Sequence, residues 1–385
     1  MRIGIDAREL AGRPTGVGRY LAEIVRAWDQ SPETDGHHFV FLAPEAIPLP
    51  STGHLSTELR IAPGRGIWWE QVVLPQLARR ASVGVLFAPG YSGPVSGGPP
   101  LVVAIHDVSF AAHPEWFRWS EGLKRRLVTR TSAHAAARVI TISEFSRREI
   151  AEHLGVPASR IDLIPPGVTN PKSPIPNPNQ IPKSNPQSPI PNPQSRVLYV
   201  GSLFNRRHVP ALIAGFGRLA RRRPEATLEI VGENRTYPYV DMERERQRSG
   251  VAAQIQLASY VSEERLAALY ASAHAFVFLS EYEGFGMTPL EALAAGIPVV
   301  VLDTPVAREV YGEAAIYVAR PEPALVERAL EQALSNDEVR ATALGAASGV
   351  LSRYSWRRCA EQVLSVLTDV PPNRTTKNTK EHEAS

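Results

Sequence analysis

Two glutamates with seven residues between them frame the part of this chain that is best suited to chemistry. Glu283 lies in a loop, Glu281 to Met287, and Glu291 follows on the first turn of a predicted helix. Gly284 and Gly286 allow backbone geometry and close approaches that other residues resist. Because a helix N-terminus behind such a loop offers free N–H groups and the positive end of a dipole, the stretch predicts a site for an anion such as phosphate.

The elements beside this loop are those that would hold it in place. The run from Phe276 to Leu279 is apolar throughout, which is typical of a buried parallel strand. Thr288 is expected to be the N-cap of a helix from Pro289 to Ala295, which ends at Gly296. A second buried strand, Val299 to Leu302, follows. The pattern is therefore strand, loop, helix and strand.

Each glutamate also has an interpretation that needs no ligand. Thr288 and Glu291 have the spacing of a capping box, in which the carboxylate only satisfies backbone donors. Glu283 alone fits a solvated loop acid. Each glutamate alone is compatible with either a structural role or a ligand-binding role. The residues around the pair are needed to distinguish these two roles.

Composition narrows the class of protein. The chain has 385 residues, 43% of them hydrophobic, which is enough for two domains with separate cores. A net charge of +3 suits an anionic ligand or a membrane surface but is too weak to indicate nucleic acid. Cys359 is the only cysteine, so internal disulfides and multi-thiolate zinc sites are excluded. With no signal peptide and no apolar run long enough for a membrane span, we expect a cytoplasmic protein.

The string from Glu283 to Val299, EGFGMTPLEALAAGIPV, resembles the Glu-x7-Glu signature of retaining, nucleotide-sugar-dependent glycosyltransferases of family four. The resemblance, which extends to the mannosyltransferase-like group-1 enzymes, runs from Met1 to about Leu367. It implies an α/β protein of the GT-B class, in which two Rossmann-like, doubly wound domains face each other across a cleft. The C-terminal helix is then expected to cross back to the first domain.

On this basis the chain divides into five expected segments. These are an acceptor domain (1–168), a Pro/Asn/Ser-rich insert (169–195), a nucleotide-sugar donor domain (196–355), a returning helix (356–370) and a tail (371–385). The insert, which repeats the hexapeptide SPIPNP, and the polar tail have little to bury, so we expect both to be disordered.

Three further motifs supply candidate residues. Gly16 and Gly18 lie in a glycine-rich loop, Gly12 to Gly18, between an expected strand from Arg2 to Asp6 and an expected helix from Arg19 to Trp28. In the resembled family such a loop approaches the donor diphosphate and the acceptor; a plain turn is the alternative. The match to the G-x-G-x-x-G motif of dinucleotide-binding proteins is weak, because Leu21 occupies the position of the third glycine. His106 ends the strand from Pro99 to Ile105, where open α/β sheets bind ligands, although a lone histidine is often structural.

The segment from Gly201 to His208 resembles the family's Gly-x4-Arg-Lys-Asn run, whose two cations hold the donor diphosphate. Arg206 matches that run, Arg207 replaces the lysine and His208 replaces the asparagine. Guanidinium still neutralises phosphate, but it is not equivalent to an ammonium group. An exposed basic helix start is the alternative.

The resemblance assigns roles to these residues. Its catalytic group is His106, Glu283, Arg206 and Arg207. Its binding group is Gly16, Gly18, Gly284, Phe285, Gly286, Met287, Thr288 and Glu291. Glu291 would hold the ribose, Glu283 the sugar hydroxyls and the two arginines the leaving diphosphate, with no metal and no other cofactor.

The expected reaction moves a hexosyl group to a glycan or lipid-linked acceptor in surface polysaccharide synthesis. GDP-mannose is the favoured donor, because the segments Gly16 to Tyr20, Trp68 to Gln71 and Ile105 to Asp107 resemble bacterial mannosyltransferases. A UDP-glucose enzyme of the same family, a nucleotide-sugar epimerase or NAD-dependent oxidoreductase, and a non-catalytic sugar-nucleotide-binding subunit are the alternatives.

One interpretation of the basic stretch from Pro114 to Arg138 is a surface that contacts a membrane or a lipid acceptor. Trp116, Phe117 and Trp119 lie at its start. Aromatic residues beside Lys and Arg suit an anionic interface. An ordinary solvated helix face is the alternative interpretation. We expect peripheral contact with the inner face of a membrane if the first interpretation holds.

Overall fold

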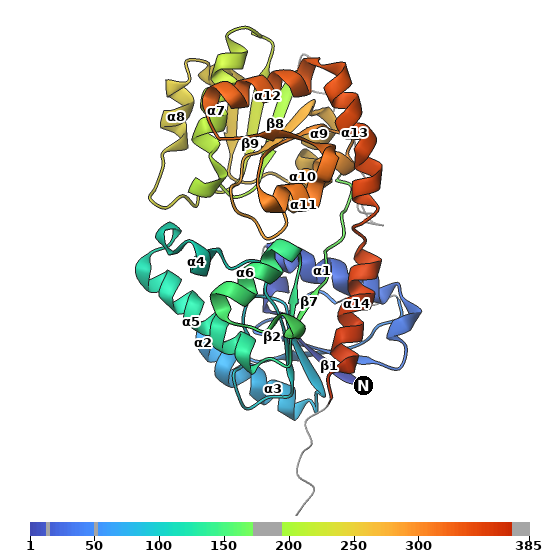
Figure 1. Cartoon of the computed structure of the whole chain (residues 1–385). Helices are drawn as coiled ribbons and strands as arrows, with labels where there is room; N and C mark the ends of the chain where they lie inside the picture. The colour runs from blue at the N-terminus through green and yellow to red at the C-terminus, as the bar shows by residue number, and fades with distance from the viewer. Residues whose placement is uncertain (13–15, 50–52, 172–194, 372–385) are drawn as a thin grey trace, which may run out of the picture.

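The computed structural model describes residues 1–12, 16–49, 53–171 and 195–371. Most of the proline-rich insert and nearly all of the tail lie outside these residues, so the expectations for them stay predictions. The described chain forms two domains, each built on a parallel sheet, and Figure 1 shows the second domain above the first.

The N-terminal domain holds a seven-stranded sheet in the order β3-β2-β1-β4-β5-β6-β7. Its strands are β1 (Arg2–Asp6), β2 (His38–Ala43), β3 (Ser56–Ile61), β4 (Val85–Ala88), β5 (Leu101–Ala104), β6 (Arg138–Thr141) and β7 (Ile161–Leu163). Its helices are α1 (Gly16–Asp29), α2 (Gly66–Trp68), α3 (Leu74–Arg80), α4 (Ser109–Ala112), α5 (Trp119–Ala135) and α6 (Glu144–Leu154).

The C-terminal domain holds a six-stranded sheet in the order β10-β9-β8-β11-β12-β13. Its strands are β8 (Arg196–Val200), β9 (Thr227–Val231), β10 (Ile255–Ala258), β11 (Ala275–Phe278), β12 (Val299–Leu302) and β13 (Ala315–Val318). Its helices are α7 (Val209–Ala220), α8 (Met242–Arg248), α9 (Glu263–Ser272), α10 (Met287–Ala294), α11 (Pro305–Tyr311), α12 (Pro323–Ser335) and α13 (Asp337–Leu351).

Strand order reverses once in each sheet, between β1 and β4 and between β8 and β11. Loops leave in opposite directions at such a switch point, which opens a crevice at the carboxyl ends of the strands. The loops after β8 and β11, which carry the arginine pair and Glu283, are joined there by a hydrogen bond from the Glu281 amide to the Arg206 carbonyl, 2.9 Å. The predicted doubly wound α/β class is confirmed.

The last helix, α14 (Trp356–Asp369), returns to the N-terminal domain and packs against α1 (Figure 1). Trp28 of α1 is 1% exposed, and its indole N–H donates to the Ala360 carbonyl at 2.8 Å. Cys359 and Leu367 are buried on the same face of α14. The predicted crossing back is confirmed.

Two predicted helix starts are wrong. Helix α10 begins at Met287 with Gly286 as its N-cap, in a left-handed conformation (φ 87°), so Thr288 is not the cap. Helix α1 already includes Gly16 and Gly18, which places both glycines in its first turn and not in the preceding loop. At α10 the chain enters the helix at a glycine, which adopts the left-handed geometry without strain and supplies no capping side chain.

No helix in the described parts of the chain is long and apolar enough to cross a membrane.

Candidate active site

The loop that carries Glu283 presses directly against the N-terminal domain. Ser143, at the start of α6, donates from its Oγ to the Gly284 carbonyl at 2.6 Å. A Cβ added to Gly284 would lie 2.0 Å from the His106 carbonyl oxygen, so no other residue fits without movement. The close approach of the two domains therefore explains this glycine, and it brings His106 and the glutamate loop together.

Glu283 is held by Arg207 and by the hydroxyl of Ser280. Its Oε1 accepts from Arg207 Nε at 2.7 Å and from Ser280 Oγ at 2.8 Å. Burial opposes ionisation of the carboxyl, but Arg207 and Arg206 outweigh it and hold the pKa of Glu283 below its ordinary value. The carboxylate is therefore a charged acceptor for hydrogen bonds at neutral pH.

The two arginines take different positions. Arg207 also donates to the Ser202 carbonyl at 2.8 Å, and its guanidinium lies 4.8 Å from the centre of the Phe278 ring. Arg206 lies 4.2 Å from the centre of the Phe204 ring and 5.8 Å from that of Trp116, which belongs to the N-terminal domain. Neither arginine is an exposed helix-start cation, since both side chains are half-buried.

Asp107 faces this pair from the other domain. Its carboxylate accepts from the Tyr91 hydroxyl at 2.7 Å and from the Ser109 amide at 2.9 Å. Although burial opposes ionisation, the charge of Arg206 and these hydrogen bonds keep the pKa of Asp107 below its ordinary value. The cleft thus holds a second ionised carboxylate that the sequence motif did not single out.

His106 is buried, and one of its nitrogens is committed. Its Nε2 lies 2.8 Å from the Pro89 carbonyl, which can only accept, so Nε2 carries the proton. Burial lowers the pKa of the imidazole, which favours the neutral ring. The Tyr20 ring packs edge-on against it at 4.8 Å. In this tautomer Nδ1 is a hydrogen-bond acceptor.

Glu291 does not cap its helix. Its Oε1 accepts from Arg19 of the N-terminal domain at 2.5 Å, and its Oε2 accepts from the Tyr270 hydroxyl at 3.3 Å. Burial raises the pKa of Glu291, and Arg19 opposes that rise only in part. The capping-box interpretation is wrong, because this buried carboxylate is directed at side chains.

The remaining predicted binding residues lie around the start of α10. Phe285 is buried and packs edge-on against Tyr354 at 4.9 Å. The Gly286 carbonyl accepts from the Tyr311 hydroxyl at 2.8 Å, and a Cβ on Gly286 would lie 2.1 Å from that oxygen. Met287 and Thr288 form the half-buried first turn, and Gly286, the N-cap, has no side chain with which to cap it. Backbone N–H groups therefore face the loop.

Sequence reasoning missed most of the contacts between the domains. Arg19 and Tyr270 hold Glu291, and Glu309 accepts from the amides of Glu144 and Phe145 at 2.6 and 2.9 Å. None of these pairs follows from spacing along the chain. Arg19 alone had a signal, since it directly follows the glycine-rich motif.

One group of side chains in the described part of the chain has the spacing of metal ligands. It consists of Glu149, Glu152 and His153 on α6. Glu149 already accepts from the Tyr282 hydroxyl at 3.0 Å, and exposed acidic groups gather without an ion in many proteins. We assign no function to this group.

Two doubly wound parallel sheets, a cleft between them and a returning final helix define the GT-B architecture. Solved structures share it. Anabaena Alr3699/HepE, in complex with UDP and glucose, superposes with a TM-score of 0.70 at 17% identity, covering 96% of this chain and 100% of that one. WaaG, a glycosyltransferase involved in lipopolysaccharide biosynthesis, gives 0.70 at 18% identity with 96% and 100% coverage. At such identities the likeness shows the fold.

Family models match both halves of the chain. The model for Glycosyltransferase Family 4 matches residues 14–170, and the model for glycosyl transferases group 1 matches residues 180–347. The chain is thus a glycosyltransferase of the family 4 and group 1 type.

Proteins with related sequences include mannosyltransferases, at low sequence identity. O-antigen chain mannosyltransferase B of Escherichia coli is 27% identical over 267 residues, 69% of either chain. Mannosylfructose-phosphate synthase of Agrobacterium fabrum is 30% identical over 48% of this chain and 41% of its own. The GDP-mannose:cellobiosyl-diphosphopolyprenol alpha-mannosyltransferase of Xanthomonas oryzae is 29% identical over 68% of this chain and 65% of its own.

Proposed function

We propose that the protein transfers a hexosyl group, with retention at the anomeric carbon, from a nucleotide diphosphate sugar to a hydroxyl of a glycan or lipid-linked acceptor. Surface polysaccharide synthesis is the proposed setting. The observation that carries the proposal is the ion pair of Glu283 and Arg207, with Arg206 beside it, at the crevice between β8 and β11. His106 of the other domain lies against the same loop.

In this proposal the cleft supplies preorganised charge. Arg206, Arg207 and the uncapped start of α10 stabilise the negative charge that grows on the leaving diphosphate. Glu283 accepts hydrogen bonds from the sugar hydroxyls, and Nδ1 of His106 is a further acceptor near the reacting carbon. The acceptor oxygen attacks on the face from which the diphosphate leaves, and a phosphate oxygen takes its proton. No metal takes part.

Glu291 is proposed to accept hydrogen bonds from the ribose hydroxyls. In the structure its carboxylate is covered by Arg19, whose side chain is 46% exposed. A bound ribose would share Glu291 with Arg19 or displace it. The first turn of α1, which holds Gly16, Gly18 and Arg19, meets Glu291 through Arg19 and is proposed to approach the donor.

GDP-mannose is the proposed donor, and the mannosyltransferases among the relatives support it. A UDP-glucose enzyme is the second candidate, since a solved neighbour binds UDP and glucose. Competition among GDP-mannose, UDP-glucose, GDP-glucose and UDP-mannose tests the donor, and NMR of the product's anomeric configuration tests the mechanism. Preference for UDP sugars would overturn the donor assignment, and an inverted product would overturn retention. Nucleotide binding without transfer to any acceptor would favour a non-catalytic subunit.

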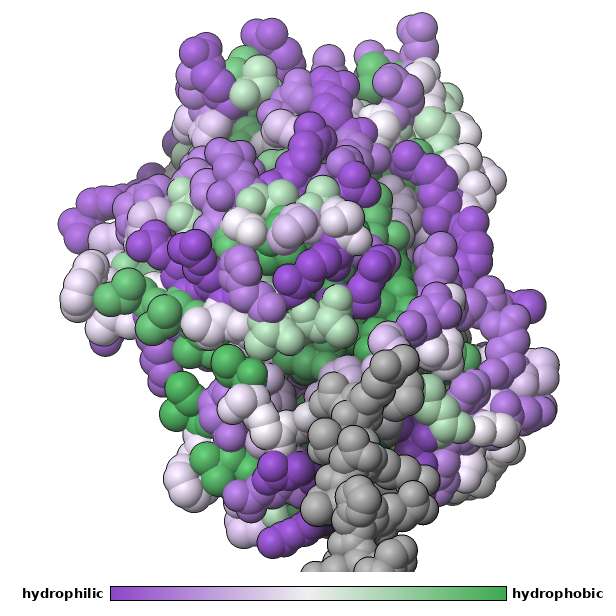
Figure 2. Space-filling view, turned by 60° about the horizontal axis from the view of Figure 1, so that its bottom comes forward, coloured by the Kyte–Doolittle hydropathy of each residue, from purple (hydrophilic) through white to green (hydrophobic). Residues whose placement is uncertain are grey.

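We further propose that helix α5 makes peripheral contact with the cytoplasmic face of a membrane. Trp119, Leu123 and Leu127 recur at the helical spacing of four and are 80%, 44% and 62% exposed. Lys124 and Arg126, also on α5, are exposed. Figure 2 shows hydrophobic residues among hydrophilic ones at the left of the view, the side of the N-terminal domain on which α5 lies in Figure 1.

The two aromatic residues just before α5 do not belong to that face. Trp116 stacks on His113 with 3.9 Å between the ring centres and also approaches Tyr282 of the C-terminal domain. Phe117 packs against the core of the N-terminal domain. The membrane face therefore rests on Trp119 and the helix that follows it.

A further inference from the structure

Tyr282 belongs to the C-terminal domain, but its side chain is buried against the N-terminal domain. It directly precedes Glu283 in the loop after β11 and is 4% exposed. Three rings of the N-terminal domain pack edge-on against it, with ring centres 5.3 Å away for His113, 6.0 Å for Trp116 and 5.3 Å for Phe145. The burial of the Tyr282 ring therefore depends on contact between the domains.

The hydroxyl of Tyr282 also has its partner in the N-terminal domain. It donates to Oε2 of Glu149, on α6, at 3.0 Å. Burial and the nearby carboxylates of Asp107 and Glu149 raise the pKa of the Tyr282 phenol, so the hydroxyl stays protonated and remains a donor. Hydrogen bonds to an ionised acceptor are stronger than those between neutral groups. The side chain is thus held both at its ring and at its hydroxyl.

The backbone around Tyr282 holds the arginine segment of its own domain. The Tyr282 carbonyl accepts from Arg206 Nε at 3.3 Å. The Glu281 amide donates to the Arg206 carbonyl at 2.9 Å. Glu283 accepts from Arg207 Nε at 2.7 Å. These three consecutive residues and the two arginines therefore form one connected unit.

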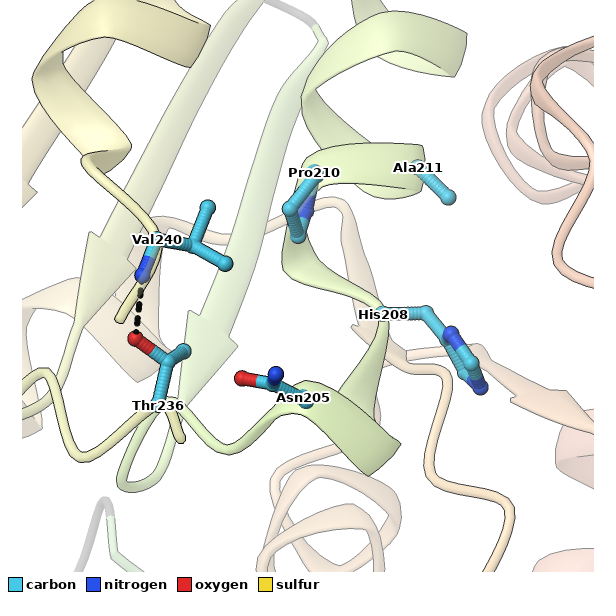
Figure 3. A pocket seen from close by; sticks show the side chains of 6 residues that line it. All are labelled: Asn205, His208, Pro210, Ala211, Thr236 and Val240. Carbon is cyan, nitrogen blue, oxygen red and sulfur yellow. Dashed lines mark hydrogen bonds between the residues drawn. The ribbon is translucent and has the colours of Figure 1, made fainter. Parts of the chain in front are cut away.

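The side chain of His208 adds a further link within this unit. Figure 3 shows His208 on the stretch that leads into α7, beside a cavity of about 250 Å³ whose six labelled residues all belong to the C-terminal domain. Its Nε2 lies 3.1 Å from a carboxylate oxygen of Glu281. The contacts of the unit within its own domain are thus extensive, and the Tyr282 side chain holds it against the N-terminal domain.

Two consecutive side chains of this loop have partners in different domains. Tyr282 is bound to the N-terminal domain, and Glu283 is bound to Arg207 in its own domain. If the domains move apart, the Tyr282 ring loses its cover and the loop loses this support. The charges at the site are then preorganised only when the domains are in contact, which is also when water is excluded from the cleft.

We propose that Tyr282 is a positioning residue that couples contact between the domains to the arrangement of Arg206 and Glu283. Its ring and hydroxyl dock on the N-terminal domain, and this docking fixes the loop in the geometry that the transfer step needs. The inference rests on the proposed transferase function and adds the residue through which domain contact acts on the site. A purely structural role, in which Tyr282 only stabilises the fold, is the alternative that the experiment must exclude.

Four variants test the two parts of the side chain. Tyr282→Phe removes the hydroxyl and keeps the ring, whereas Tyr282→Ala removes both. Glu149→Ala removes the partner on α6, where Ala is the most favourable helix residue. Tyr317→Phe is the matched control, because the hydrogen bond that it deletes, to the Gly312 carbonyl at 2.6 Å, lies within one domain. Thermal melts establish that each protein is folded.

Hydrogen–deuterium exchange measures docking without any substrate. The informative peptides cover residues 280–287 of the loop and 143–149 at the start of α6, where the amides of Glu144 and Phe145 donate to Glu309 of the other domain. Tyr282→Ala should raise exchange in both peptides, Tyr282→Phe should raise it less, and Tyr317→Phe should match wild type. A rise confined to one peptide, or no rise in either, would overturn the coupling.

Nucleotide release from GDP-mannose and from UDP-glucose, with water as the acceptor, measures the effect on chemistry. We expect the rate of Tyr282→Phe to fall by about tenfold or more, the scale of a hydrogen bond to a charged group, while affinity for GDP and UDP, measured by calorimetry, changes less. A fall in melting temperature with an unchanged rate would establish the structural alternative, and so would equal losses of rate and nucleotide affinity.

A double-mutant cycle tests whether Glu149 is the partner that matters. Glu149→Ala should lower the rate by a similar factor, and Tyr282→Phe/Glu149→Ala should lower it no further, because both changes remove the same interaction. Independent, multiplying losses would overturn the assignment of Glu149.

The remaining outcomes separate the proposal from the function on which it rests. If the wild type binds neither GDP nor UDP and releases nucleotide from neither donor, the transferase function fails, while the exchange measurement still decides whether Tyr282 docks the loop. If the wild type is active and Tyr282→Ala equals it in rate and in exchange, the coupling is wrong and the transferase function stands.

Discussion

The guanidinium of Arg19 and the carboxylate of Glu291 meet at 2.5 Å across the two domains, although 272 residues separate them in the chain. The Glu291 side chain is 4% exposed and that of Arg19 is 46% exposed, so Arg19 covers the carboxylate on the side of the cleft. Any ligand that binds Glu291 must therefore either share the carboxylate with Arg19 or displace the Arg19 side chain. Under the proposed ribose role, nucleotide binding and contact between the domains are therefore coupled.

Removing Arg19 should make stability depend on pH. The folded pKa of Glu291 is already raised above its ordinary value of 4.5, because burial outweighs Arg19, and Arg19→Gln raises it further. The contribution of such a group is fully present below pH 4.5 and is lost as pH rises through the folded pKa. The melting temperature of Arg19→Gln, relative to wild type, should therefore fall more at pH 7.5 than at pH 5.

The double variant Arg19→Gln/Glu291→Gln is the control for this measurement. It has no carboxyl group at position 291, so the additional pH dependence should disappear. An equal deficit of Arg19→Gln at both pH values would show that Arg19 does not lower the pKa of Glu291.

Glu291→Gln should weaken nucleotide binding and leave the fold intact. The amide keeps an acceptor for one donor but loses the charge, and hydrogen bonds to charged groups contribute about 1.5–3 kcal/mol. We expect the Kd for GDP and UDP to rise by about tenfold or more, measured by calorimetry. Unchanged affinity together with unchanged turnover would remove the ribose role.

Glu283→Gln should separate transfer from binding. The change takes the charge from the partner of Arg207, whose Nε lies 2.7 Å from Glu283, and so disturbs the preorganised site. We expect kcat to fall by about a hundredfold, the scale of losing one preorganised partner, while nucleotide affinity persists. Glu322→Gln, an exposed acid paired with Arg320, is the control. A loss confined to nucleotide affinity would contradict the assignment.

Chelation should leave transfer unchanged. In the proposed mechanism Arg206, Arg207 and the start of α10 balance the diphosphate charge, which is the task that a divalent ion performs in other phosphate sites. The measurement is initial rate with EDTA and then with added magnesium. Activity lost with EDTA and restored by magnesium would rule out this arrangement of charge.

The face of α5 should bind anionic vesicles. Leu123→Ser/Leu127→Ser removes two exposed apolar side chains, while Lys124 and Arg126 remain to attract the surface, so cosedimentation should fall but not vanish. Binding by the wild type should weaken with salt, because exposed charges are screened. Ile61→Ser, at a 51% exposed position on β3, is the control. Equal cosedimentation of both variants and wild type would contradict a role for α5.

Local patterns along the sequence predicted individual strands of the fold, and the resemblance to family-four glycosyltransferases predicted the arrangement of the two domains and the returning helix. Strand β1 from Arg2 to Asp6 and strand β12 from Val299 to Leu302 have the predicted bounds, since short apolar runs between turn residues specify buried parallel strands. The helix starts at Thr288 and after Gly18 were wrong for an equally local reason. At α10 a glycine at the helix entry replaces the side-chain cap on which the prediction relied, and α1 already includes the two glycines that the prediction placed in the loop.

Individual residues of the candidate site were predicted from the sequence, but the hydrogen bonds and ion pairs between them were not. Glu283 and Arg207 were both named, yet nothing in the chain indicated that they would pair, because they lie on loops from neighbouring strands. Arg19 was not named as a site residue, and its partner, Glu291, belongs to the other domain. Such contacts depend on how two domains meet, which the periodicity within each domain does not contain.

The position of α14 has a consequence for biosynthesis. Trp28 is translated early, but the carbonyl that its indole N–H binds lies 332 residues further along. The face of α1 that α14 covers therefore stays exposed on the ribosome until the whole second domain has been made. Folding of the first domain is thus completed only after the second has emerged, and exposed apolar surface in that interval is open to chaperones and to aggregation.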